Sequence, residues 1–307
     1  MANITAKDVA ALRAKTGIGM MECKKALVEA DGDMDKAVKI LREKGELKAQ
    51  SKMETRIAAD GVVDILKDGD KTAIIEVNSE TDFVAKNANF QVFVKELLRC
   101  IIENNPANVE ELLASNYSAE QTVDAKLKEM IFQIGEKITI RRFAVACGTT
   151  ATYIHGTGSI GVVVSFDTDC ADKEGFDRFA KNIALQVGAY TTPYLTREDV
   201  PASVIESEKE ILMAQIANDP ANAKKPQNII EKMVVGRIGK FYTQNCLMDM
   251  EYFIDDSLTV SKYVEQTAKE LGGSIKITGF FRFEKGEGIQ KKEENFADEI
   301  AKLTGGN

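Results

Sequence analysis

Apolar positions in the first fifty residues recur with a helical period. Thr5 and Asp8 have capping-box spacing, and glycines at 17 and 19 interrupt the pattern before a second helix that begins near Met20. A third helix is indicated by a stripe that ends before Gly45: Met34, Ala37, Val38 and Leu41. The pattern therefore predicts three short helices, followed by a charged connector over residues 44–56.

From residue 57 onward the period changes from helical to alternating. Strands at 61–66 and 72–77, joined by a polar turn that contains Gly69, form a predicted β-hairpin. An amphipathic helix follows, and a third strand is predicted at 137–146. The apolar stripe of this helix is Phe90, Phe93, Val94, Leu97 and Ile101.

The same order recurs in the second half of the chain. Strand patterns at 152–155 and 159–166 precede a helix whose stripe repeats the spacing of the first with an offset of 86 residues: Phe176, Phe179, Ala180, Ile183 and Val187. The strand pattern at 138–143 likewise resembles residues 275–283. We infer two copies of one α+β unit, because matched spacing on this scale is unlikely by chance.

The second copy contains an insertion. Two apolar stripes on either side of Pro220 and Pro226 predict a helical hairpin, and a final helix is expected near residues 293–303. The predicted fold class is α+β, with antiparallel sheets in both repeats. Its parts are a three-helix module at 1–56, a first repeat at 57–147, a second repeat at 148–285 with the hairpin inserted at 198–241, and a C-terminal helical module at 286–307.

Charge and hydropathy narrow the range of partners. The chain has 40 basic and 48 acidic side chains, a net charge of −8, and therefore no overall basic field for nucleic acid or an anionic membrane surface. Residues 1–56 differ, with 12 basic and 9 acidic side chains. The apolar runs are far shorter than the roughly 20 residues that a membrane helix needs. We expect a cytoplasmic protein that binds no nucleic acid directly and no membrane.

The sequence lacks most familiar catalytic machinery. His155 is the one histidine, and the five cysteines include no C-x-x-C pair, which argues against a zinc cluster and against a disulfide framework. The glycine-rich nucleotide-binding motifs and the nucleophile-elbow motif are also absent. We therefore predict no catalytic residue, no bound metal and no cofactor.

Two segments carry a specific resemblance. Residues 16–27 (TGIGMMECKKAL) and 76–87 (EVNSETDFVAKN) resemble the signature segments of the elongation factor Ts family. The similarity extends through residues 140–142, 153–156 and 279–283, and so covers essentially the whole chain. Members of this family are guanine-nucleotide exchange factors for the GTPase elongation factor Tu. The resemblance implies that this chain binds that GTPase with GDP and promotes GDP release.

The second signature segment is the main candidate site. The resemblance implies that Thr81, Asp82, Phe83 and Val84 dislocate Mg²⁺ in the partner, with Phe83 as a wedge and Asp82 as the anchor of the turn. The spacing from Ser79 to Asp82 also fits a capping box, which would place the Asp82-Phe83 pair in the first turn of a short helix. The residues alone leave open whether Phe83 is exposed or packs inward beside Val84.

Further contacts follow from the same resemblance. Arg13, Met20 and Met21 correspond to residues that dock on the nucleotide domain of the partner, and His155 corresponds to a contact with one of its β-domains. Read without the family, one of the two methionines would be a core residue and His155 an ordinary turn residue. Cys23 is expected to be a small core residue, because no histidine lies near it in sequence.

Three function classes remain at this stage. The first is a binding protein without enzymatic chemistry, acting as an exchange factor. The second is a scaffold, because three short helices with a Met-Gly loop resemble a ubiquitin-associated (UBA-like) module. The third is an enzyme built on Asp82, Glu76 or Cys147. The inserted hairpin adds a homodimer as a further hypothesis, although its two stripes can equally satisfy each other.

Overall fold

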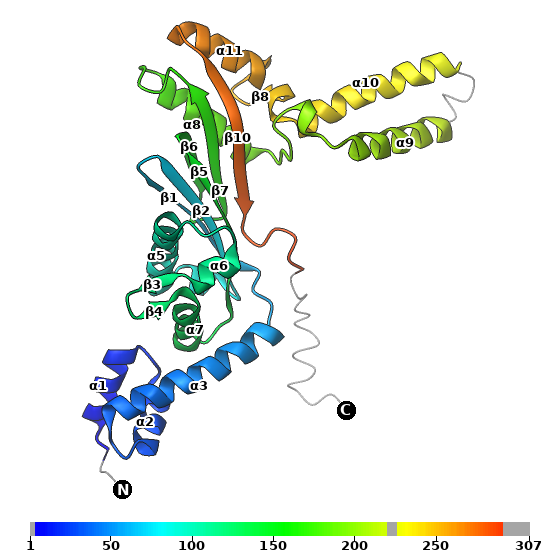
Figure 1. The fold of residues 1–307 in the computed structure, drawn as a ribbon. Coiled ribbons are helices and arrows are strands. Elements are labelled where there is room, and N and C mark those ends of the chain that lie inside the picture. The colour runs from blue at the N-terminus through cyan, green and yellow to red at the C-terminus, as the bar shows by residue number, and fades with distance from the viewer. Residues whose placement is uncertain (1–3, 220–225, 291–307) are drawn as a thin grey trace.

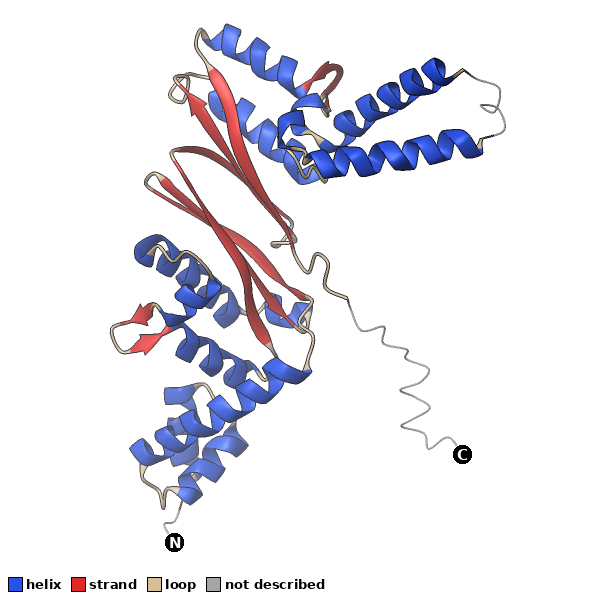
Figure 2. Cartoon of the chain, turned by 45° about the vertical axis from the view of Figure 1, so that its right-hand side comes forward, coloured by secondary structure: helices blue, strands red, loops and turns tan. Residues whose placement is uncertain are grey.

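The computed structural model describes residues 4–219 and 226–290. Helices and antiparallel sheets are combined in one chain, which confirms the predicted α+β class. The two main sheets lie face to face in the middle of the molecule, and helices cover their outer faces (Figure 2). In the described ranges no helix is both long enough and apolar enough to cross a membrane.

The N-terminal module consists of α1 (Ala6–Thr16), α2 (Met20–Glu29) and α3 (Met34–Thr55). The Thr5–Asp8 capping box is formed, and Gly17 ends α1 with a positive φ of 70°. The module has a small core of its own, and its likeness to a ubiquitin-associated fold stays a prediction. The buried members of this core include Leu12, Cys23, Leu27 and Leu41.

The predicted connector at 44–56 is wrong, because α3 continues without a break to Thr55. Gly45 lies inside this helix, where its missing side chain leaves room for the ring of Phe132 on α7 (Val123–Ile134). Ala49, one turn further on, is buried in the core of the first repeat. Tertiary packing therefore stabilises the second half of α3, and the helix period alone did not reveal it.

The first repeat contains a three-stranded antiparallel sheet with the order β1-β2-β5. Its strands are β1 (Asp60–Asp68), β2 (Lys71–Ser79) and β5 (Ile138–Cys147). The predicted hairpin and third strand are thus confirmed, and all five stripe residues of α5 (Ala88–Asn104) are buried. The elements that accompany them are α4 (Asp82–Ala85), α6 (Val109–Ala114), β3 (Asn116–Ser118), β4 (Gln121–Thr122) and α7 (Val123–Ile134).

The second sheet has the equivalent order, β6-β7-β10, again with the second hairpin strand in the middle. Its strands are β6 (Thr149–His155), β7 (Ile160–Thr168) and β10 (Ile275–Glu284). They are accompanied by α8 (Phe176–Ala189), two short 3-10 helices (Arg197–Asp199 and Leu247–Asp249), β8 (Glu251–Tyr252), β9 (Asp255–Thr259) and α11 (Val260–Leu271).

The structure extends the repeat beyond the sequence pattern. Helices α7 and α11 both begin after a capping threonine, end at a left-handed glycine and lead into the third strand. The offset between these two helices is 137 residues, from Val123 to Val260, instead of 86. The second copy is therefore longer by 51 residues, and the inserted segment 202–245 accounts for most of them.

The insertion is a helical hairpin of α9 (Ala202–Asn218) and α10 (Gln227–Asn245), which projects from the second repeat (Figure 1). Its helices begin and end about four residues later than the predicted bounds of 198–241. Leu212 and Ile216 pack against Val234 and Ile238 inside the hairpin. The predicted final helix at 293–303 lies outside the described residues, as does most of the C-terminal module at 286–307.

Small residues let the two sheets approach closely. A side chain at Gly161 would lie 2.4 Å from Val63, and one at Gly158 would lie 2.7 Å from the Val63 carbonyl oxygen. The carbonyl of Gly158 also accepts a hydrogen bond of 2.8 Å from the backbone of Val63. The turn between β6 and β7 is thereby fixed against the edge of the first sheet.

Candidate functional site

Phe83 lies on a turn that is held by its neighbours Thr81, Val84 and Ala85. The backbone N–H and hydroxyl of Thr81 donate to the Glu136 carboxylate at 3.0 and 2.9 Å. Val84 and Ala85 are buried against the first repeat, whereas Phe83 is 79% exposed. The inward packing of Phe83 left open by the sequence is therefore wrong, and its ring points into solvent from a rigid support.

The capping box expected from Ser79 to Asp82 is not formed. Helix α4 is instead capped at Thr81, and no side chain bonds to its first N–H groups. The Ser79 hydroxyl donates to the Thr81 carbonyl, and Glu136 takes the donors of Thr81. Two segments far apart in sequence thus hold the turn that local capping was expected to hold.

Asp82 lies in the same turn and is half-exposed. Its carboxylate pairs with Lys86 one helical turn later at 2.6 Å. The hydrogen bond and the negative charge of Asp82 raise the pKa of Lys86. This is an ion pair in contact with water, so Asp82 can exchange Lys86 for a donor on a partner at little cost.

The three candidate residues of the N-terminal module are all exposed. Met20 and Met21 open α2, and they are 46% and 66% exposed. Arg13 lies near the end of α1 and is exposed as well. Neither methionine is a core residue, whereas Cys23 is fully buried as expected. The module thus presents flexible apolar side chains that are typical of an adaptable contact.

His155 ends β6 at the turn that touches the first sheet, and it is exposed. The hydroxyl of Tyr153 lies 2.7 Å from its Nδ1 atom. The ring of Tyr153 packs on α8, where a side chain at Gly188 would come within 2.9 Å of it. Tyr153 was not identified from the sequence, although the alternation of a strand places residues 153 and 155 on one face.

The structure brings the turns that carry Phe83 and His155 to the same end of the two sheets. Ser79, just before the Phe83 turn, pairs with Asp60 at the start of β1. Asp60 forms an ion pair with Lys285, whose backbone N–H donates to Ser159 in the turn after His155. The N-terminal module lies apart from them, because the 22 residues of α3 span about 33 Å.

Glu76 has no exposure and four hydrogen-bond donors. Arg141 and Arg142 contact its carboxylate at 2.9 and 2.7 Å, and Asn78 and the backbone of Gly286 donate at 3.0 and 2.8 Å. Burial favours the neutral form of Glu76, but these donors and the charge of Arg142 outweigh it and lower its pKa. Glu76 therefore joins the first sheet to the segment after β10 and is not a general base.

Among the described residues, the remaining enzyme candidates have no partner that could activate them for catalysis. Asp82 pairs with a lysine, Cys147 is exposed at the end of β5, and the one histidine of the sequence contacts Tyr153. Within the described residues, no group of three His, Cys, Asp or Glu side chains is arranged to hold a metal ion. These contacts favour a binding surface over a catalytic site.

The candidate residues also lie outside two well-formed cavities of the described chain. One cavity of about 500 Å³ lies beside the β1–β2 turn and α8, and one of about 370 Å³ lies between the N-terminal module and α7. Neither is lined by Phe83, His155, Arg13 or the two methionines. The candidate site is therefore an extended surface, unlike the concave pocket of a small-molecule site.

These features define an α+β protein with an internal repeat, in which the candidate residues are exposed and lie in separate parts of the surface. The family described as Elongation factor TS matches residues 80–287. Relatives named Elongation factor Ts include one from Syntrophotalea carbinolica, 43% identical over 305 residues, and one from Clostridium perfringens (strain SM101), 45% identical over 307 residues. Each alignment covers 98% of this chain and 99% of the relative. The chain belongs to the elongation factor Ts family.

Proposed function

We propose that this chain is a guanine-nucleotide exchange factor for elongation factor Tu in translation elongation. The observation that carries the proposal is Phe83, an exposed aromatic side chain on a turn held by Glu136 and by the buried Val84. Family membership supplies the partner and the reaction. The protein contributes binding energy and no bond chemistry of its own, and it requires no cofactor.

The exchange mechanism acts on the Mg²⁺ and phosphate site of the partner. A GTPase holds GDP through a phosphate-binding loop and a Mg²⁺ ion that demands near-ideal octahedral geometry. A wedge that displaces the groups around the ion therefore weakens nucleotide binding. Thr81 and Val84 hold the turn, and Phe83 enters the partner. The Asp82 carboxylate leaves Lys86 and accepts a hydrogen bond from a donor of the partner instead.

Linkage gives a direct test of this function. If the chain lowers the affinity of elongation factor Tu for GDP, then GDP must lower the affinity of elongation factor Tu for the chain by the same factor. We expect calorimetric titration to show tight binding to nucleotide-free elongation factor Tu and much weaker binding when GDP and Mg²⁺ are saturating. Equal affinity in both conditions would exclude an exchange factor and favour a simple scaffold.

Removing Mg²⁺ is expected to reproduce part of the effect of Phe83. Chelation with EDTA and insertion of Phe83 weaken the same phosphate contacts, and changes at one shared site are non-additive. EDTA should therefore speed GDP release from elongation factor Tu alone, and the difference between wild type and Phe83→Ala should shrink without the metal. A deficit of unchanged size in EDTA would assign Phe83 to the base or sugar side of the nucleotide pocket.

Arg13, Met20 and Met21 are proposed to dock the N-terminal module on the partner, with His155 as a second contact beside Phe83. Replacing both methionines by alanine should weaken binding about 30-fold, since each loses an apolar contact worth about 1 kcal/mol. The release rate at saturating concentration should not change. Val28→Ala, which truncates another exposed apolar residue of α2, is the matched control. An unchanged half-saturating concentration would remove the methionines from the interface.

Dimerisation through the inserted hairpin stays a prediction. Its support is that Ile211, Met213 and Val235 remain exposed after the inner stripe of the hairpin is buried. Sedimentation velocity of the free protein at increasing concentration tests it, and a single monomeric boundary throughout would refute it.

The net charge of −8 supports the absence of direct nucleic-acid binding.

A further inference from the structure

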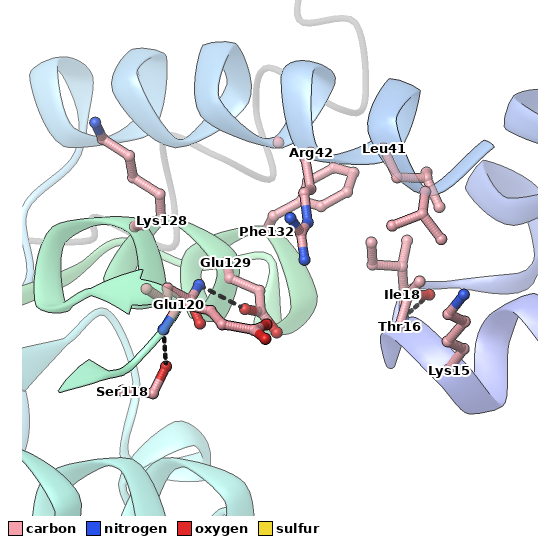
Figure 3. Close-up of a pocket in the computed structure, with 14 residues that line it drawn as sticks. Lys15, Thr16, Ile18, Leu41, Arg42, Ser118, Glu120, Lys128, Glu129 and Phe132 are labelled. Carbon is pink, nitrogen blue, oxygen red and sulfur yellow. Dashed lines mark hydrogen bonds between the residues drawn. The ribbon is translucent and has the colours of Figure 1, made fainter. Parts of the chain in front are cut away.

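The N-terminal module touches the first repeat mainly through α3, which lies along α7. Figure 3 shows the cavity of about 370 Å³ between α1 and α3 on one side and α7 with the β3–β4 hairpin on the other. Ile18 and Leu41 face it from the module, and Glu120 and Glu129 line it from the first repeat. Because this space separates the two surfaces, the module is held chiefly where α3 lies along α7.

Phe132 is the central side chain of that contact. It belongs to α7, yet it packs against the small core of the N-terminal module. A side chain at Gly45 of α3 would come within 3.1 Å of its ring, and the Lys48 ammonium lies 5.4 Å from the ring centroid. Gly45, Lys48, Ala49 and Lys52 lie on one face of α3, since they are spaced by three and four residues.

Gln133, the next residue of α7, holds the other end of the module. Its side-chain amide donates to the carbonyl of Thr16, the last residue of α1, at 2.7 Å. The same amide donates to Glu129 at 2.8 Å, which fixes its direction. A side chain at Gly17 would come within 3.3 Å of Gln133, so the amide fits closely against the end of α1. Two neighbouring residues thus hold both α1 and α3.

The internal repeat provides a natural comparison. Helix α11 is the counterpart of α7, and the positions that correspond to Phe132 and Gln133 are Lys269 and Glu270. Both of these are exposed. The second repeat has no helical module seated on this face in the described part of the chain (Figure 1). The repeat that holds a helical module therefore has an aromatic side chain and a neutral amide at these two positions. The repeat that holds none has two charged side chains there.

We propose that Phe132 and Gln133 are positioning residues that fix the N-terminal module relative to the Phe83 turn. This inference rests on the proposed function. The module carries Arg13, Met20 and Met21 at the far end of α3, so a small rotation at the α3–α7 contact displaces them widely. A module that is already fixed binds without the entropy cost of ordering it, which is the general advantage of preorganisation.

Pulsed electron paramagnetic resonance of the free protein measures the positioning directly. Cys147 is the one exposed native cysteine, and Val28→Cys adds a second site on α2, so two spin labels report the distance between the module and the core. We expect a narrow distance distribution in the doubly labelled protein that carries only Val28→Cys. The distribution should be broader when Phe132→Ala or Gln133→Ala is added. Unchanged distributions in both variants would overturn the proposal.

Exchange kinetics supply the functional readout. Phe132→Ala should raise the half-saturating concentration for GDP release about tenfold and leave the saturating rate unchanged, because only preorganisation is lost. In a variant in which Met20 and Met21 are already replaced by alanine, Phe132→Ala should raise the half-saturating concentration little further. Fully additive effects, or a loss confined to the saturating rate, would contradict a positioning role.

Two variants separate positioning from general instability. Leu127→Ala truncates a buried residue on the opposite, core-facing side of α7, and it should lower thermal stability without broadening the distance distribution. Phe132→Leu keeps an apolar side chain against Gly45 and should restore most of the parental behaviour. If the parent protein itself fails to speed GDP release, the proposed function fails, while the distance measurement still decides whether Phe132 and Gln133 position the module.

Discussion

Phe83→Ala is expected to slow stimulated GDP release from elongation factor Tu by about 30-fold or more, the equivalent of about 2 kcal/mol for an aromatic anchor at the centre of an interface. The fold should be unaffected, because Phe83 is almost wholly in solvent and surface truncations usually change stability by less than about 0.5 kcal/mol. GDP release by stopped-flow fluorescence and thermal melting check the two halves of this prediction.

A matched control is available elsewhere on the surface. Phe253, between β8 and β9, is also an exposed phenylalanine, at 40%, and it lies on the second repeat away from the Phe83 turn. Phe253→Ala should release GDP at the wild-type rate. A Phe83→Ala variant that melts early would return Phe83 to the core, and one that exchanges normally would remove it from the mechanism.

Glu76→Gln is expected to cost about 3 kcal/mol of folding stability, at the lower end of the range for breaking a buried ion pair, because both arginines keep some contact with water. The substitution removes the charge that holds Arg141, Arg142 and the backbone of Gly286 together. Urea unfolding measures the loss. Glu96→Gln, in an exposed pair with Arg99, is the control and should change stability by less than about 1 kcal/mol.

The Glu76 contribution also has a defined pH dependence. The pKa of Glu76 is lowered in the folded state, so its ionised form stabilises the fold above the unfolded pKa of about 4.3. This stability is lost as the pH falls through the lowered folded pKa. The difference between wild type and Glu76→Gln should therefore be full at neutral pH and shrink below about pH 4. A difference independent of pH would mean that shape, and not charge, is what Glu76 contributes.

The periodicity of apolar residues predicts the helices and strands correctly where one face of the element packs against a core. The stripe from Phe90 to Ile101 and its counterpart from Phe176 to Val187 are buried as predicted, since each repeats at the spacing of a helix packed on a sheet. Helix α7 was missed, although Val123, Leu127 and Ile131 recur at four-residue spacing and are buried. This spacing is visible in the sequence, and it would add a second pair of matching helices, α7 and α11, to the internal repeat.

Other features depend on contacts between distant segments and have no local signature. Helix α3 continues past Gly45 because Phe132, 87 residues later, packs on it. The turn before Phe83 is held by Glu136 and not by the local capping box. The exposure of Phe83 follows from the burial of its neighbour Val84, and a short helix gives no period from which to infer it.

The central claim, that this chain is an exchange factor for elongation factor Tu, is tested most directly by the release of labelled GDP from purified elongation factor Tu in the presence of excess unlabelled GDP. We expect substoichiometric amounts of this protein to accelerate release many-fold and to act repeatedly, because GDP displaces the factor at the end of each cycle. A release rate that is unchanged when the protein is added at any concentration would contradict it.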